Sequence, residues 1–131
     1  MPETPAPHDH FAPLRGAEFI VLTTYRRTGV AVPTTVWFAE VGGMLYLTTG
    51  AQAGKAKRLR ANPAVRVAPS DQVGNAQGPA LAGRARVLAP HEDAAAIAAL
   101  QQKYGEAFTT LTAQMDAAQP AGNRIYVIIT P

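Results

Sequence analysis

The chain has 131 residues, 47% hydrophobic and 16% charged, a composition typical of one globular domain with its own core. It contains no cysteine, which excludes disulfides, thiolate metal sites and a cysteine nucleophile. The net charge of +3 favours an anionic ligand but is too small to indicate nucleic acid. No apolar run is long enough to span a bilayer and no signal-peptide core is found, so we expect a cytoplasmic protein without membrane contact.

The first thirteen residues differ in composition from the rest of the chain. Residues 1–13 carry four prolines and two histidines among polar residues, and we predict a flexible N-terminal arm followed by a single domain over residues 14–131. His8 and His10 are potential metal ligands. Because no other ligand lies near them in the sequence, we predict no metal site there.

Three runs rich in β-branched and aromatic residues follow one another after the arm. They cover Phe19–Tyr25, Val30–Ala39 and Met44–Thr49, and the polar turns Arg26–Gly29 and Glu40–Gly43 separate them. Such short connections predict an antiparallel meander of three strands.

The second of these runs is uncharged on both faces. Alternate residues of Val30–Ala39 form two rows, and neither row contains an ionisable side chain. A sheet that is apolar on both sides needs cover on both sides, from the core and from a helix, a ligand or a second subunit. Pro33 belongs at a sheet edge or a bulge, and for Trp37 the residues alone favour core packing over a ligand face.

The rest of the chain alternates between strand and helix patterns. Three further strands are predicted at Ala64–Ala68, 79–88 and Arg124–Thr130, and a loop at Pro69–Gly78 joins the first two. Two helices are predicted at Pro90–Tyr104 and Phe108–Ala118. Gly105 is a suitable residue to end the first of these helices, whose buried stripe we predict to be Ile97, Leu100 and Tyr104. The order of elements is therefore βββ-α-ββ-αα-β, a mainly β fold with helices.

A cationic stretch lies between the third and fourth predicted strands. The segment Thr48–Pro63 reads as a strand end, a turn and a short helix, and no acidic residue occurs between positions 41 and 70. Helical phase places Lys55 and Arg58 on one face and Lys57 on the other. The first turn of a helix presents free N–H groups and a positive dipole, which suit a phosphate. The stretch predicts an anion-binding corner, and a solvated basic helix is the alternative.

Six strings of this sequence, taken in order, resemble one protein family. They are LTTYRRTG, PTTVWF, LYLTTG, GKAKRLRANPAVRVAP, GPALAGRARVL and KYG. Together they are similar to the pyridoxamine 5′-phosphate oxidase-like split β-barrel proteins, and within these to the oxidoreductases that use the deazaflavin coenzyme F-420. The resemblance implies a six- to seven-stranded antiparallel split β-barrel (the FMN-binding split barrel) with two to three helices. It also implies a homodimer with two cofactor sites at the subunit interface.

The resemblance further implies which residues bind the cofactor. The ring is expected beside Thr34, Thr35, Val36 and Trp37, and the phosphate beside Thr48, Thr49, Lys55, Lys57 and Arg58. Lys57 matches a family ligand although helical phase places it opposite Lys55, unless Lys55 still belongs to the turn.

The function that the resemblance implies is hydride transfer between coenzyme F-420 and an unsaturated small-molecule acceptor. The cofactor would carry the chemistry, which agrees with a sequence in which we identify no catalytic side chain. Two alternatives stay open: an FMN-dependent reductase or oxidase, and a non-catalytic protein that binds a flavin, haem or tetrapyrrole. Nucleic-acid binding is disfavoured because aromatic residues are few and the cations lie in one short helix.

Overall fold

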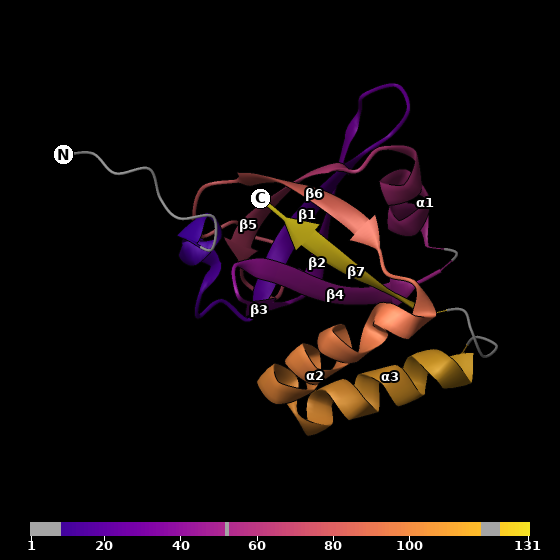
Figure 1. The fold of residues 1–131 in the computed structure, drawn as a ribbon. Coiled ribbons are helices and arrows are strands. Elements are labelled where there is room, and N and C mark those ends of the chain that lie inside the picture. The colour runs from indigo at the N-terminus through magenta and orange to yellow at the C-terminus, as the bar shows by residue number, and fades with distance from the viewer. Residues whose placement is uncertain (1–8, 52, 119–123) are drawn as a thin grey trace.

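The computed structural model describes residues 9–51, 53–118 and 124–131 and shows seven strands in one antiparallel sheet with three α-helices (Figure 1). The order of the strands in the sheet is β2-β1-β5-β6-β7-β4-β3. The elements are β1 (Phe19–Tyr25), β2 (Ala31–Trp37), β3 (Ala39–Val41), β4 (Met44–Gly50), α1 (Gly54–Ala61), β5 (Ala64–Ser70), β6 (Leu81–Val87), α2 (Asp93–Tyr104), α3 (Glu106–Ala118) and β7 (Arg124–Thr130). The predicted mainly β fold with helices is confirmed, and the seven antiparallel strands fall within the six to seven that the resemblance implies, one more than the six predicted from the residue pattern.

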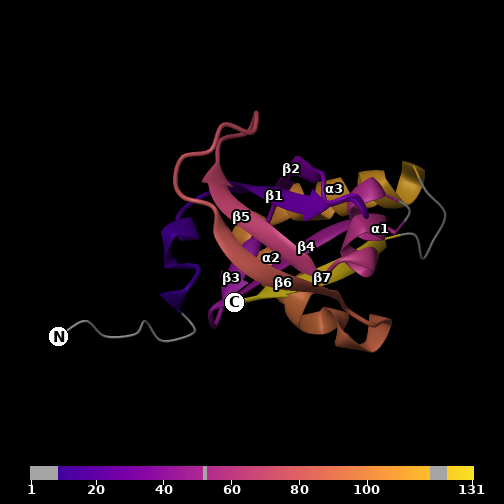
Figure 2. The same ribbon diagram turned by 90° about the horizontal axis from the view of Figure 1, so that it is seen from above.

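The sheet curls into a half-barrel around an apolar core (Figure 2). Alternate residues of each strand point inward, as the burial of every second residue in β1 shows. Helix α1 covers one end of the half-barrel, and the α2–α3 hairpin lies along its outside (Figure 1). The core residues are fully or almost fully buried and include Leu22, Phe38, Leu45, Leu47, Val67 and Val127.

The predicted three-stranded meander is wrong, because the second run is two strands and not one. The chain breaks at Phe38: β2 pairs with β1, whereas β3 pairs with β4. Strands β2 and β3 consequently lie at the two opposite ends of the sheet order, and no strand pairing joins β2 to β4. This break is what leaves the barrel split.

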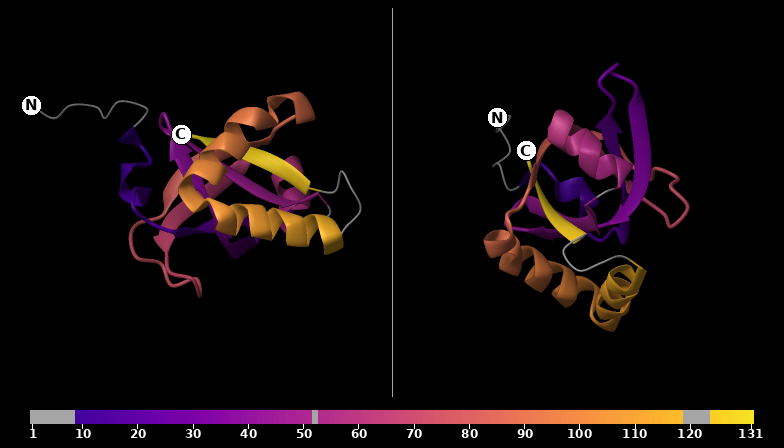
Figure 3. Two further views of the ribbon diagram at one scale, coloured as in Figure 1. Left: turned by 90° about the horizontal axis from the view of Figure 1, so that it is seen from below. Right: turned by 90° about the vertical axis from the view of Figure 1, so that its right-hand side faces the viewer.

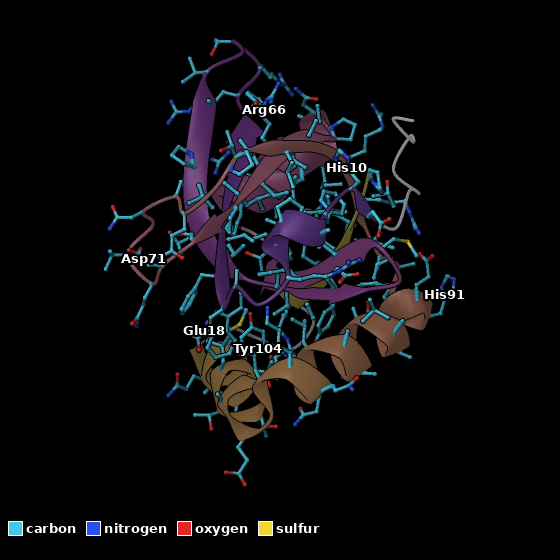
Figure 4. The ribbon with its side chains drawn as sticks, turned by 90° about the vertical axis from the view of Figure 1, so that its left-hand side faces the viewer. His10, Glu18, Arg66, Asp71, His91 and Tyr104 are labelled. Carbon is cyan, nitrogen blue, oxygen red and sulfur yellow. The ribbon has the colours of Figure 1, made fainter. Side chains whose placement is uncertain are left out.

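Side chains from the end of α2 satisfy the backbone at the break. The Phe38 N–H donates to the Tyr104 hydroxyl at 3.0 Å, and the Phe38 carbonyl accepts from Lys103 Nζ at 2.7 Å. The Tyr104 hydroxyl in turn donates to the Glu18 carbonyl at 2.6 Å and lies 2.8 Å from the Phe38 carbonyl, while Lys103 Nζ also donates to Ala17 (Figure 4). A peptide without a strand partner is thereby kept hydrogen-bonded where water is excluded.

The N-terminal segment is more ordered than its composition predicts. Residues 1–8 lie outside the described residues, but Phe11 is fully buried and a 3-10 turn, η2 (Ala12–Leu14), packs against β5. Gly83 on β6 makes room for this packing, because a Cβ there would lie 3.3 Å from the Phe11 ring and 2.8 Å from Ile129. The predicted arm therefore ends before Pro13, since Phe11 belongs to the barrel core.

Helix α2 faces the sheet with alanines rather than with the predicted stripe. A 3-10 turn, η3 (Pro90–Glu92), precedes the helix. The helix ends at Gly105, whose φ of +58° favours glycine. Leu100 is buried as predicted, but Ile97 is 41% exposed and Ala96 and Ala99 are buried in its place. Small side chains let the helix approach β3, β4 and β7 closely. None of the helices within the described residues is long and apolar enough to cross a bilayer.

The two side chains at the break predict an unusual pH dependence of stability. Burial of its Nζ lowers the pKa of Lys103 from 10.5 to about 8, although the residue as a whole is exposed, and burial raises the pKa of Tyr104 from 10.0 to about 12. Between about pH 8 and 10, Lys103 is protonated in the unfolded chain but largely neutral in the folded protein. Unfolding therefore takes up a proton, and the free energy of unfolding rises with pH. Above about pH 10, Tyr104 stays protonated in the folded protein but ionises in the unfolded chain. Unfolding therefore releases a proton, and the free energy of unfolding falls with pH.

Urea denaturation across this pH range measures the effect. We expect Lys103→Met to reduce the rise and Tyr104→Phe to reduce the fall, each relative to the wild-type profile. The remainder comes from Lys55 and Tyr126, because burial also lowers the pKa of Lys55 and raises the pKa of Tyr126. Profiles that stay parallel to the wild type in both variants would contradict the assignment.

Candidate functional site

A cavity of about 410 Å³ opens at the split of the barrel. Strands β2 and β4, helix α1 and the α2–α3 hairpin all contribute lining residues. Helix α1 and the hairpin are well separated in space (Figure 3). The size of the cavity is that of a site for a small molecule or cofactor. The lining residues are Phe19, Thr35, Val36, Trp37, Thr48, Thr49, Lys55, Gln72, Leu100, Phe108 and Leu111.

The cavity brings together most of the residues that the sequence predicts as cofactor ligands. Those on its surface are Thr35, Val36, Trp37, Thr48, Thr49 and Lys55. The other predicted ligands, Thr34, Lys57 and Arg58, do not line it. Residues from a strand, a second strand and a helix thus meet in one place, and their role in binding remains a prediction.

The end of β4 supplies two hydroxyl groups with different hydrogen bonds. Thr48 Oγ1 donates to the carbonyl of Ile125 on β7 at 2.8 Å, so its proton is already engaged. Thr49 is 4% exposed and makes no side-chain hydrogen bond within the described residues. Thr49 is therefore the better placed of the two to donate to an anion, whereas Thr48 can only accept.

Lys55 is the one ionisable side chain among the lining residues. It lies in the first turn of α1, whose N-cap residue, Ala53, provides no capping side chain. Burial, and secondarily the charge of Arg58, lowers the pKa of Lys55. A partly desolvated ammonium group beside uncapped helix N–H groups gains stabilisation from an anion.

Arg58 and Lys57 line a second hollow next to the cavity. This hollow measures about 250 Å³ and is formed by Tyr25, Arg26, Arg27, Lys57, Arg58 and Ala61. Arg58 Nε donates to the buried Thr24 Oγ1 at 2.6 Å, and its Nη1 lies 2.9 Å from the position of a Cβ on Gly54. The guanidinium group is consequently folded over the first turn of α1, beside the cavity and not within it.

An aromatic stack fixes the tryptophan that lines the cavity. The rings of Trp37 and Tyr104 lie 4.3 Å apart with an interplanar angle of 11°. The Tyr104 hydroxyl is tied to the backbone at Phe38 and Glu18, so the stack cannot slide without losing those hydrogen bonds. Offset stacking of this kind holds a ring in one plane.

Sequence reasoning missed the apolar side of the cavity. Leu100, Phe108 and Leu111 come from the α2–α3 hairpin, which the helical pattern predicted without showing which face of the barrel it covers. Gln72 comes from a loop ordered by Asp71, whose pKa is lowered by hydrogen bonds from the backbone and side chain of Asn75. Such loop contacts have no periodic signal in a sequence.

The chemistry that the cavity can perform follows from its lining. Within the described chain, no carboxylate, histidine, cysteine, methionine or tyrosine lines it, so it can hold and orient an anionic ring compound but offers no general acid or base other than Lys55. The described residues contain no cluster of three or more metal-ligating side chains. A ring nitrogen of His10 lies 2.7 Å from the Ala82 carbonyl, His91 is exposed near the start of α2 (Figure 4), and His8 lies outside the described residues.

Comparison with known proteins identifies relatives of the whole chain. The family model described as pyridoxamine 5′-phosphate oxidase matches residues 7–131. No curated protein sequence matches the chain.

Three similar solved structures illustrate the fold. The haem storage protein HutZ from Vibrio cholerae has a TM-score of 0.69 and 15% identity, over 92% of this chain and 85% of that one. A haem-binding protein from Mycobacterium smegmatis has a TM-score of 0.64 and 17% identity, over 98% of this chain and 52% of that one. An F-420 reductase has a TM-score of 0.58 and 22% identity, over 100% of this chain and 95% of that one. At such identities the likeness establishes the fold and not the activity.

The aromatic stack can be tested directly because Trp37 is the only tryptophan of the chain. We expect Tyr104→Leu to shift the emission to longer wavelength and to increase acrylamide quenching, with a loss of stability of about 0.5–1.5 kcal/mol from the stack alone. Tyr104→Phe keeps the ring but removes the hydroxyl hydrogen bonds to Phe38 and Glu18, and it should change the emission less than Tyr104→Leu does. Identical spectra for the wild type and the leucine variant would show that the stack does not form in solution.

Proposed function

Because the chain belongs to the pyridoxamine 5′-phosphate oxidase family, we propose that it is an oxidoreductase that binds the deazaflavin coenzyme F-420 in the cavity at the barrel split. The observation that carries this proposal is the pairing of a half-buried lysine with an oriented tryptophan in one cavity of cofactor size. The reaction is hydride transfer between the coenzyme and an unsaturated organic acceptor.

The residues at the α1 side of the cavity suit a phosphate group. Lys55 provides the charge, the Thr49 hydroxyl provides a donor, and the first turn of α1 provides backbone N–H groups. Arg58 adds positive potential from beside the first turn. No acidic side chain among the lining residues opposes an anion.

The β2 side of the cavity suits a ring. Strand β2 is an edge strand of the described sheet, so one side of its backbone at Thr35 and Val36 has no strand partner and can hydrogen-bond a heterocycle. Trp37, held by Tyr104, fixes the wall beside it. When bound in its reduced form, the coenzyme supplies a hydride, and the protein contributes orientation and exclusion of water. The proton that completes the product comes from solvent or from Lys55, the one acid among the described residues that line the cavity.

Two of the similar structures are named for haem, which makes haem the competing ligand. Haem iron in proteins is held by His, Cys, Met or Tyr, and none of these lines the cavity within the described chain. FMN shares the phosphate and the ring with the deazaflavin, so only measurement separates these two.

We also propose that two copies of the chain associate with the cavities at their interface. The open edge of β2 and the 54% exposed Val30 beside it are features that a second subunit would cover. Light scattering on the purified protein should give twice the monomer mass, and a monomer across micromolar concentrations would reject the dimer.

A titration of the purified protein with oxidised F-420, FMN and haemin tests the cofactor assignment. Each ligand is added in turn while the emission of Trp37 is followed. We expect F-420 to quench it with micromolar or tighter affinity and to bind at least ten times more tightly than FMN. Binding of FMN or haemin with none of the deazaflavin would overturn the assignment.

Variants of the basic helix localise the phosphate in the same titration. Lys55→Ala should weaken F-420 binding by about 1.5–3 kcal/mol because a charge-assisted hydrogen bond is lost. Arg58→Ala should weaken it less, since this side chain lies beside the cavity. Arg84→Ala, which removes an exposed cation on β6, is the charge-matched control and should leave the affinity unchanged. Equal effects of all three variants would mean that net charge, and not a defined site, attracts the coenzyme.

A further inference from the structure

A second large hollow lies on the outer face of the barrel, over β6, β7 and β4. These three strands are neighbours in the sheet (Figure 1), and the hollow measures about 530 Å³, a volume that suits a small molecule. Its lining includes Met44, Pro63, Arg84, Arg86, Ile128 and Thr130, and it shares no residue with the cavity at the barrel split. We call this hollow the β6–β7 groove.

The register of the strands sets the chemistry of the groove. Ile129 is fully buried in the barrel core, so its neighbours Ile128 and Thr130 point outward. Strand pairing places Arg86 opposite Ile128 and Arg84 opposite Thr130. Two guanidinium groups therefore share one outer face with an aliphatic side chain.

The floor of the groove is apolar because the cover by α2 ends there. Tyr46 and Tyr126 belong to the cluster that packs α2 onto the sheet, and Ile128 packs against this cluster while staying partly exposed. Met44 lies on the same side of β4 as Tyr46, beyond the cluster, and is also partly exposed. A ligand in the groove can thus cover apolar surface that the helix leaves open.

The two arginines of the groove differ in their partners. Arg86 Nη1 donates to both carboxylate oxygens of Glu92, at 3.0 and 3.1 Å, and Glu92 also accepts from the Ala89 N–H. These hydrogen bonds lower the pKa of Glu92, so it is ionised at neutral pH and fixes Arg86 in place. Arg84 makes no ion pair and no side-chain hydrogen bond with the rest of the described chain. The arginines and Glu92 together therefore leave one positive charge without a partner.

We propose that the β6–β7 groove binds an amphipathic monocarboxylate, that is one carboxylate on an aliphatic or aromatic body. The planar guanidinium of Arg84 offers unpaired N–H donors that match a carboxylate, and Arg86 adds a second positive charge beside it. One negative charge balances the site, whereas a dianionic head such as a phosphate monoester leaves an excess negative charge near Glu92. The body covers Ile128 and Met44, whose flexible thioether adapts to different shapes.

The methyl group of Met44 reports on the groove in solution. Of the methionines in the described residues, Met44 lines the groove and Met115 on α3 does not. Protein labelled with ¹³C in its methionine methyl groups is titrated with 4-phenylbutanoate, whose ring current shifts the signal of a methyl group nearby. We expect the Met44 signal, assigned with Met44→Leu, to move saturably at submillimolar concentration while the Met115 signal stays in place. A Met44 signal that moves with protein concentration and not with the ligand would assign the groove to a contact between two copies and reject the proposal.

Three matched ligands test the two halves of the assignment in the same titration. 4-Phenylbutan-1-ol has the body without the charge, acetate has the carboxylate without the body, and 4-phenylbutyl phosphate carries a second negative charge at a pH where it is dianionic. We expect each of them to bind at least ten-fold more weakly than 4-phenylbutanoate. Equal affinity of the alcohol or of acetate would show that the groove does not recognise both halves. Equal or tighter binding of the phosphate would assign the groove to phosphorylated ligands, and each of these results would overturn the proposal.

A pair of arginine variants assigns the head group to Arg84. Arg84→Gln should weaken 4-phenylbutanoate binding at least ten-fold and leave the affinity for the alcohol unchanged. Arg66→Gln removes another exposed arginine, on β5 and outside the groove, and should bind as the wild type does. Both variants change exposed side chains, so folding is preserved. An equal loss in the two variants would mean that net charge attracts the acid, and it would reject the site.

A competition experiment separates the groove from the cavity at the barrel split. The proposal does not depend on the coenzyme, because the two hollows have no lining residue in common. The emission of Trp37, which lines the cavity and not the groove, should stay unchanged when 4-phenylbutanoate saturates the Met44 signal. Quenching of Trp37 at the same concentration, with no shift of Met44, would place the acid in the cavity and overturn the assignment to the groove.

Discussion

The hydrogen bonds that the end of α2 makes to the backbone of Phe38 are the interaction on which this architecture depends. An apolar run that is long enough for one continuous strand is interrupted at a single residue, and the Tyr104 hydroxyl and Lys103 Nζ take the place of the missing strand partner. Burying an unpaired peptide at this point would cost about 1–3 kcal/mol for each group. The interruption therefore exists only where the α2–α3 hairpin is docked, and the split of the barrel depends on that docking.

The same interaction shapes the cavity. Because the chain passes at the break from β2, at one edge of the sheet, to β3, at the other edge, no ladder of hydrogen bonds joins β2 to β4. The cavity is lined by residues of both strands. Tyr104 both closes the break and stacks on Trp37, so the fold and one wall of the site are fixed by one side chain. The hairpin that supplies Tyr104 also supplies the apolar side opposite α1. The cationic side and the apolar side of the cavity follow from where these elements meet.

Solved structures that share this barrel are named for different ligands, including haem and F-420. What distinguishes them must lie in the side chains that line the split, because the sheet itself is common to all. Among the described residues of this chain, the lining provides one cation, hydroxyl and backbone groups, and aromatic and aliphatic walls, and it contains no side chain that holds haem iron. Such a lining is consistent with the proposed role of holding a cofactor that carries its own chemistry.

The sequence alone determined the strands other than β3, the helices, the cationic helix and the resemblance to the split-barrel family, because periodicity, turn residues and charge clustering are local signals. It also placed Lys55 and Leu59 on the half-buried side of α1. Only the tertiary structure decided that the second run breaks at Phe38, that Arg58 bonds to Thr24 beside the cavity, and that Leu111 lines the same cavity as Trp37. Each of these depends on contacts between segments that lie far apart in the chain. The alternation of residues along one segment carries no information about which distant segment will pair with it or pack against it.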